Sequence, residues 1–170
     1  DGSLGPSLIV CPASLVYNWG AEFTKFAPSF NAVVVAGTKA ERRTAIGRAF
    51  RADEPTVLIT SYDLLRRDVD DYTANEQRFN VMALDEAQYI KNHTTKIAKA
   101  VKAVAADHRF ALTGTPIENR LSELWSIFDF LMPGLLGSYK RFHERYELPI
   151  SNARAADGST AEGRAAAQVN

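Results

Sequence analysis

Five short apolar runs, separated by stretches with helical periodicity, restrict how this chain can fold more than any other feature. The runs are residues 8–11, 32–35, 57–59, 81–84 and 110–112. They are nearly continuous in apolar character, which is typical of strands covered on both faces of a parallel sheet. Alternating strands and helices favour an open sheet with right-handed crossovers. The sequence therefore predicts an α/β fold of three layers, helix, sheet and helix, around a mainly parallel sheet.

The intervening segments carry the signals of helices. Two apolar faces repeat at helical spacing. They are Leu15, Trp19, Phe23 and Phe26 in the first segment, and Leu121, Leu124, Trp125, Phe128 and Met132 in the last. Thr38 and Glu41 have the spacing of a capping box, which predicts a helix running to residue 50. A further short helix is predicted at residues 139–146.

The charge balance limits how the chain could meet a polyanion. Lys and Arg together number 20, as do Asp and Glu, so the formal net charge is zero. A free-standing nucleic-acid binder usually has a basic excess, so any DNA contact would use a few placed groups. Arg42, Arg43, Arg48 and Arg51 could form a basic patch, but acidic residues flank them and a solvated helix face is the favoured interpretation.

The cysteine count and the apolar runs bear on location. Cys11 is the only cysteine, which excludes an intrachain disulfide, fits a reducing compartment and favours a small buried side chain. Residues 1–6 lack the pattern of a signal peptide. No apolar run approaches the roughly 20 residues needed to span a bilayer. We therefore expect a cytosolic protein without a membrane partner.

Two adjacent carboxylates give the first chemical signal. Asp85 and Glu86 directly follow the strand at residues 81–84. Ligands of open α/β sheets collect at the carboxyl ends of strands. There, one carboxylate could hold Mg²⁺ and the other could orient or deprotonate an attacking water. Alternatively, the pair could simply begin the next helix and complement its dipole. The pair alone does not decide between these interpretations.

Three other strand ends carry small polar groups. Thr113 and Gly114 follow the last strand, and residues 115–118 have the form of a capping box with proline at the first helical position. Pro12 and Ser14 follow the first strand, where Ser14 is a candidate N-cap and the helix start a candidate anion site. Thr60 and Ser61 end the third strand and could donate hydroxyls to phosphates. Each has a capping interpretation of its own.

In this order, the four elements resemble the Swi/Snf-like family of DNA-dependent ATPases within helicase superfamily 2. The resemblance covers residues 7–150. Residues 8–12 with Ser14, Leu15 and Trp19 resemble motif Ia, and residues 57–62 resemble the next DNA-facing motif. Residues 85–88 resemble motif II, the Walker B acidic box. Residues 112–116 with 118 and 119 resemble motif III.

The resemblance implies a role for each candidate residue. Asp85 would coordinate Mg²⁺ with the nucleotide, and Glu86 would activate water. Gln88, Thr113, Gly114 and Thr115 would couple the nucleotide to DNA. Pro12, Ser14, Thr60 and Ser61 would lie along one strand of double-stranded DNA. The implied cofactor is ATP with Mg²⁺, and the implied partners are double-stranded DNA and a second RecA-like lobe.

The resemblance also implies the domain organisation. Residues 1–137 would form part of a first RecA-like lobe, and residues 138–150 would begin the helical insertion of the family. Residues 151–170 are rich in Ala, Ser and Gly, which predicts a tail or linker. The parent protein would be cytoplasmic and nucleoid-associated in a bacterium, or nuclear in a eukaryote.

Two departures from the family pattern stand out. Gln88 occupies a position where the family often has histidine, although its amide can also donate and accept hydrogen bonds. No G-x-x-x-x-G-K-[ST] phosphate-binding loop occurs in the sequence, and such a loop should lie upstream of Leu8. These 170 residues alone are therefore expected to be inactive as an ATPase.

Three functions remain open on the residues alone. The first is a piece of an ATP-driven DNA translocase that remodels nucleoprotein complexes. The second is a degenerate RecA-like lobe that serves only as a binding or scaffold module. The third is an unrelated flavodoxin-like or receiver-like domain, which gives no reason for residues 112–116. A lysine-bearing phosphate loop upstream and an arginine-bearing lobe downstream would favour the first over the second.

Overall fold

The computed structural model describes residues 5–114 and 120–150 and contains one sheet of five parallel strands. The strand order is β2-β3-β1-β4-β5. Each of the five apolar runs lies in a strand or, for Val35, directly after one. The predicted α/β class with a parallel sheet is confirmed.

The elements alternate along the chain as expected. The strands are β1 (Ser7–Cys11), β2 (Asn31–Val34), β3 (Thr56–Ser61), β4 (Phe79–Asp85) and β5 (Ala106–Leu112). The α-helices are α1 (Val16–Phe26), α2 (Lys39–Ala49), α3 (Tyr62–Arg67), α4 (Val69–Thr73), α5 (Lys96–Ala103), α6 (Leu121–Leu131) and α7 (Tyr139–Phe142). Short 3₁₀ turns occupy Ala13–Leu15, Ala74–Glu76 and Ala87–Ile90, and a π-helical turn, His143–Glu147, continues α7.

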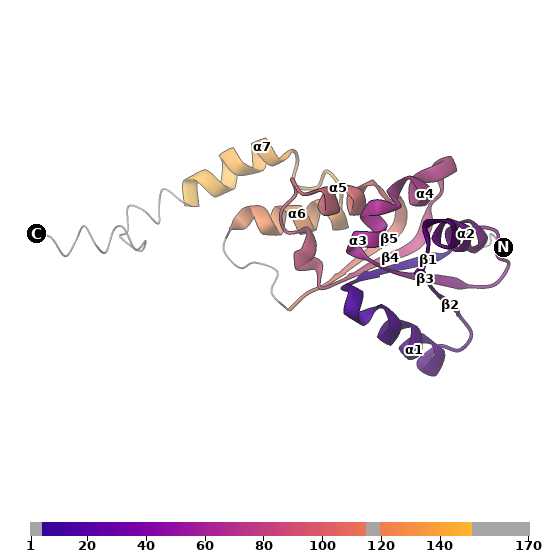
Figure 1. Cartoon of the computed structure of the whole chain (residues 1–170). Helices are drawn as coiled ribbons and strands as arrows, with labels where there is room; N and C mark the ends of the chain where they lie inside the picture. The colour runs from indigo at the N-terminus through magenta and orange to yellow at the C-terminus, as the bar shows by residue number, and fades with distance from the viewer. Residues whose placement is uncertain (1–4, 115–119, 151–170) are drawn as a thin grey trace, which may run out of the picture.

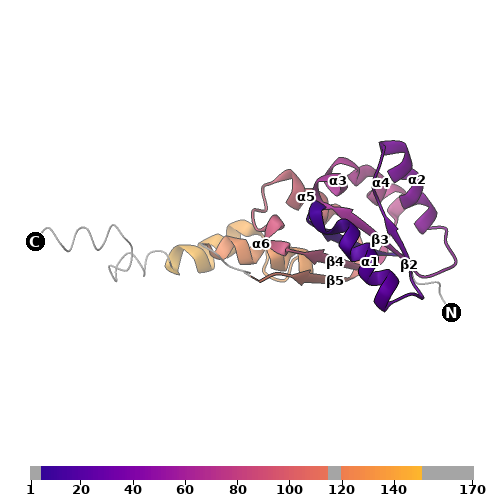
Figure 2. The ribbon, with the colours of Figure 1, turned by 60° about the horizontal axis from the view of Figure 1, so that its bottom comes forward.

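The sheet separates two apolar cores. Successive side chains of a strand point to opposite faces, so Leu8 and Val10 of β1 enter the larger core, while Ile9 and Cys11 enter the smaller one. Helices α2 to α6 cover the larger core (Figure 1). Among the described helices, α1 alone covers the smaller core, and Figure 2 brings it in front of the sheet.

One part of the sheet departs from the expectation of full coverage. Phe110 and Leu112 of β5 pair in register with Ala83 and Asp85 of β4, on the face that carries α1. Helix α1 packs mainly against β2 and β3, at the other end of the sheet from β5. Phe110 therefore remains 55% exposed and Leu112 48% exposed. The apolar run correctly predicted the strand, but it did not predict that one face of β5 would be exposed.

The helix starts match the sequence at one place and differ at another. At α2, the Thr38 hydroxyl accepts from the Glu41 backbone N–H and the Glu41 carboxylate accepts from that of Thr38, so the predicted capping box is confirmed. The prediction that Ser14 is an N-cap is wrong. Ser14 lies inside a 3₁₀ turn, and Leu15 takes the cap position of α1 without a side-chain hydrogen bond.

Helix α6 is apolar on two sides because it lies between the sheet and the helix that follows it. Ile127 and Phe130 belong to the larger core. The face predicted from periodicity points mainly elsewhere, toward α7. Leu121, Leu124 and Phe128 line an apolar groove of about 280 Å³ together with Leu136, Phe142 and Tyr146. Trp125 is buried, as its position on a core face predicted.

A buried ion pair joins α2 to the start of α4. Arg42 donates two hydrogen bonds to Asp68, one of them at 2.8 Å, and a third to the Gly37 carbonyl. Both side chains of the pair are buried. The favoured interpretation of Arg42 as part of a solvated face is therefore wrong, whereas Arg43, one residue on, is exposed and makes a looser contact with Asp71.

The remaining predictions about organisation can be placed as follows. Within residues 5–114 and 120–150, every helix is too short or too polar to cross a bilayer. The helix expected at residues 139–146 is present as α7 and its π-helical turn. The domain boundaries remain predictions. The tail at residues 151–170 and the capping box at residues 115–118 lie outside the described residues.

We expect Asp68→Asn to lower the free energy of unfolding by about 3–5 kcal/mol, because it leaves the buried Arg42 charge uncompensated. Asp71→Asn is the matched control. It removes the carboxylate of a looser pair, in which the Arg43 side chain is 77% exposed and the Asp71 side chain 17% exposed, and should cost less than about 1 kcal/mol. Urea unfolding followed by circular dichroism measures both. Equal losses in the free energy of unfolding would show that the Arg42–Asp68 pair stabilises the fold no more than the Arg43–Asp71 pair does.

Candidate functional site

Four strand ends bring the candidate residues to one edge of the sheet. All strands are parallel, so their carboxyl ends lie on the same side. Asp85 is the last residue of β4, which lies between β1 and β5. β1 ends at Cys11, β3 at Ser61 and β5 at Leu112. The segments predicted to act together therefore surround Asp85.

Two aromatic side chains hold Asp85. The indole Nε1 of Trp19 in α1 donates to Asp85 Oδ2 at 2.9 Å. The hydroxyl of Tyr62, the first residue of α3, donates to the Asp85 backbone carbonyl at 2.8 Å. Burial, followed by the nearby Asp85 charge, raises the pKa of Tyr62, so its phenol stays protonated and remains a donor. Tyr62 also stacks on Tyr89, with ring centroids 4.7 Å apart.

Glu86 has an unusual backbone conformation. Its φ of 54° and ψ of 54° place it in the left-handed region, which is uncommon for residues other than glycine, asparagine and aspartate. A 3₁₀ turn, Ala87–Ile90, follows, and the next α-helix begins only at Lys96. The acidic pair thus precedes a short 3₁₀ turn, with Glu86 at its N-cap position, and does not begin an α-helix. Non-glycine residues in such conformations cluster at functional sites.

A chain of hydrogen bonds connects Glu86 to the end of β5. The Gln88 amide donates from Nε2 to Glu86 Oε2 at 2.6 Å. Its other end, Oε1, accepts from the Thr113 hydroxyl at 2.8 Å. Gly114 follows and is exposed, and a Cβ there would meet nothing within 4 Å. Space alone thus does not require glycine at this position. Thr115 lies outside the described residues.

Cys11 ends β1 beneath this edge and is fully buried, as predicted. Its thiol lies 3.8 Å from the Thr60 carbonyl. Burial, and secondarily the charge of Asp85, raise the pKa of Cys11 to about 12, so the thiol is neutral near pH 7. A neutral buried thiol is a poor nucleophile. Cys11 therefore belongs to the core under the site.

The four residues predicted to contact DNA differ in accessibility. Ser14 is exposed, and Pro12 is half-buried. Ser61 is buried, and its hydroxyl caps α3 by accepting from the Leu64 N–H. Thr60 is 0% exposed, so its hydroxyl does not reach solvent. In this conformation, Ser14 is therefore the only one of the four that presents a hydroxyl to solvent.

The acidic pair fits a magnesium ion held jointly with a nucleotide. Among the described residues, no group of three or more His, Cys, Asp or Glu side chains could enclose a metal. Mg²⁺ is usually bound by one or two carboxylates together with substrate phosphates and water, rather than by a cage made only of protein. Asp85 and Glu86 supply that number of carboxylates.

Trp19 and Tyr62 are the contacts that sequence reasoning missed. The sequence pattern places Trp19 on a core face and Tyr62 in the motif at residues 57–62, but it predicts no bond from either side chain to the acidic segment. The available signal was chemical. An aromatic residue that carries an N–H or O–H usually finds a partner when its ring is buried. Sequence separations of 66 and 23 residues concealed which partner it was.

Comparisons with known proteins agree on one family. A family model described as SNF2-related domain matches residues 2–167. TATA-binding protein-associated factor MOT1 of Saccharomyces cerevisiae is 46% identical over 160 residues, which is 94% of this chain and 8% of that protein. A Mycoplasma pneumoniae protein named uncharacterized ATP-dependent helicase is 47% identical over 142 residues, which is 84% of this chain and 13% of that protein.

A solved structure supports the same relationship. The Sulfolobus solfataricus SWI2/SNF2 ATPase core in complex with dsDNA matches with a TM-score of 0.74 and 42% sequence identity. The match covers 89% of this chain and 30% of that chain. This chain thus spans under a third of the solved core and a smaller fraction of the two relatives.

Proposed function

This chain belongs to the SNF2-related family, and from that membership we propose that it is part of the first motor lobe of an ATP-driven double-stranded DNA translocase. The observation that carries the proposal is the arrangement around Asp85 and Glu86. Two adjacent carboxylates end a central parallel strand, and side chains from three other segments of the same edge form hydrogen bonds to this acidic segment or to its Gln88. A nucleoprotein remodelling role, which the resemblance to the Swi/Snf-like family implies, is part of the same proposal.

The acidic pair divides two tasks in this proposal. Asp85 holds Mg²⁺, which when bound neutralises charge on the phosphates of ATP. Glu86 orients the attacking water and accepts its proton. The hydrogen bond from Gln88 fixes one carboxylate oxygen of Glu86 and leaves the other for water. The left-handed backbone of Glu86 turns the chain away from the strand at this point.

The same chain of hydrogen bonds couples hydrolysis to DNA. Gln88 joins Glu86 to Thr113, so a displacement of the segment after β5 reaches the water-activating carboxylate through two contacts. Gly114 and Thr115 continue that segment and share the coupling role. The second RecA-like lobe is the proposed partner on this side, and the family resemblance implies that this lobe supplies the arginine finger.

The proposed DNA track runs over the ends of β1 and β3. Ser14 and Pro12 lie at its accessible part and offer a hydroxyl and the backbone at the start of α1 to phosphates. Ser61 contributes by capping α3. The burial of Thr60 gives no support to a direct contact by that side chain. Small neutral groups position a duplex but cannot read its bases.

The proposed location follows the origin of the parent protein. Relatives named TATA-binding protein-associated factors occur in yeast and in Homo sapiens, the latter 41% identical over 162 residues. A eukaryotic parent would therefore work in the nucleus, and a bacterial one at the nucleoid.

In the intact ATPase, Glu86→Gln should lower DNA-stimulated turnover by about 10²–10⁴-fold, because it removes the proton acceptor. Nucleotide binding should be largely retained, since the Asp85 carboxylate remains. Asp85→Ala should instead weaken Mg²⁺-dependent nucleotide binding itself. A phosphate-release assay and a nucleotide titration separate the two effects. Unchanged turnover in Glu86→Gln would contradict the roles assigned to the two carboxylates, whereas absence of turnover in the wild type would favour a scaffold module.

The 170 residues alone should hydrolyse ATP at a negligible rate and bind it weakly. Phosphates are usually held by the backbone N–H groups and lysine of a phosphate-binding loop, and this sequence has none. A steady-state ATPase assay with and without duplex DNA is the measurement. Robust DNA-stimulated turnover would show that the phosphates are held by a different part of this chain.

Ser14→Glu should reduce DNA stimulation of the intact ATPase while sparing basal turnover, because it places a negative charge where a phosphate would lie. Thr24→Glu adds the same charge to an exposed position near the other end of α1 and should have little effect. Titrations of labelled duplexes across a salt series should show no sequence preference. Equal losses in both variants would contradict a contact at Ser14.

A further inference from the structure

We infer that Trp19 is the positioning residue of Asp85, which fixes the orientation of the carboxylate that binds Mg²⁺. This inference rests on the proposed function. It adds a role for a side chain of α1, which packs against β2 and β3 and otherwise serves the smaller core.

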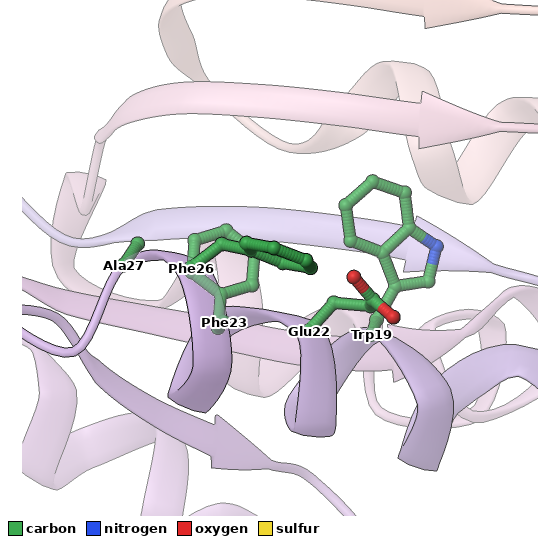
Figure 3. A pocket seen from close by; sticks show the side chains of 5 residues that line it. All are labelled: Trp19, Glu22, Phe23, Phe26 and Ala27. Carbon is green, nitrogen blue, oxygen red and sulfur yellow. The ribbon is translucent and has the colours of Figure 1, made fainter.

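The indole reaches the carboxylate from a well-supported position. Its ring packs against the smaller core and lies 6.2 Å from the ring of Phe23, one helical turn further along α1. Trp19 also lines one end of an apolar groove of about 270 Å³ with Glu22, Phe23, Phe26 and Ala27. In Figure 3, the indole nitrogen lies on the side of the ring away from Phe26 and Ala27. The apolar contacts therefore hold the ring while its N–H faces the acidic segment.

The hydrogen bond acts on the side chain of Asp85 rather than on its backbone. Trp19 donates to Oδ2, which leaves Oδ1 for a metal ion or its water. Tyr62 independently holds the backbone carbonyl of the same residue. The two donors thus restrict different torsions, and Trp19 is the one that restricts rotation of the carboxylate.

Hydrogen-bonding partners of metal ligands have a measurable effect. Removing such a partner typically costs 10–100-fold in metal affinity or activity, because the ligand loses its fixed orientation. If Trp19 only filled the core, replacing it by phenylalanine would change the stability of the protein without a specific change in the Mg²⁺ dependence of nucleotide binding.

The test measures equilibrium binding of a fluorescent non-hydrolysable ATP analogue by the intact ATPase across a Mg²⁺ series. Trp19→Phe keeps an aromatic ring and removes the N–H, and we expect the half-saturating Mg²⁺ concentration to rise about tenfold. Phe23→Leu perturbs the same groove and smaller core but has no polar group with which to bind Asp85, and should stay within about twofold. Trp19→Leu, which also lacks a hydrogen-bond donor, serves as a second variant if thermal unfolding shows that Trp19→Phe does not fold.

A double-mutant cycle tests whether Trp19 changes the Mg²⁺ dependence through the Asp85 carboxylate. If Trp19 acts through the Asp85 carboxylate, adding Trp19→Phe to Asp85→Asn should shift the Mg²⁺ dependence no further. Additive effects, equal losses in Phe23→Leu, or an unchanged Mg²⁺ dependence in Trp19→Phe would each overturn the inference. If the wild type binds the nucleotide in a Mg²⁺-dependent way and Trp19→Phe has the same Mg²⁺ dependence, only the role of Trp19 is overturned and the proposed function stands. No Mg²⁺-dependent binding by the wild type would overturn the proposed function as well.

Discussion

The parallel direction of all five strands is the constraint on which the site depends. In such a sheet the strands end at one edge, and the segments that leave them are neighbours whatever their separation in sequence. Residues that follow β1, β3, β4 and β5 can therefore act on one another across about a hundred positions of chain. Burial of the strands between helices, which stabilises any fold of this class, also places Asp85 next to hydrogen-bond donors from segments distant in sequence.

That placement lets the fold tolerate a costly backbone conformation. A non-glycine residue in the left-handed region costs about 1–3 kcal/mol and persists where its surroundings hold it. At Glu86, the Tyr62 hydroxyl fixes the preceding carbonyl and the Gln88 amide fixes the carboxylate. The buried ring of Tyr62 and the buried methyl of Ala87 attach the turn to the larger core. The strained residue is therefore supported from both sides, and its side chain is available for chemistry.

Sequence reasoning found the sheet because apolar runs and strand ends are local signals. It also found the α2 capping box, whose two partners lie three residues apart. It missed the Arg42–Asp68 pair and the hydrogen bond from Trp19 to Asp85. Hydrophobic periodicity predicts which face of a helix is apolar, but it does not predict which residue distant in sequence will bind a polar group at the end of a side chain. The burial of Thr60 could have been predicted from the sequence. The apolar run before it predicted coverage on both faces, and β3 continues through Thr60 with every residue buried.

The open side of β5 has a consequence for the chain in solution. Among the described strands, β5 has a neighbour only in β4, and Phe110 and Leu112 lie exposed beside that free edge. Unpaired backbone groups next to apolar side chains form a template for intermolecular strand pairing. Within the described residues, this edge of β5 is therefore a site at which two copies of the chain could pair. A segment that covers β5, or a charged residue at its edge, would reduce this pairing.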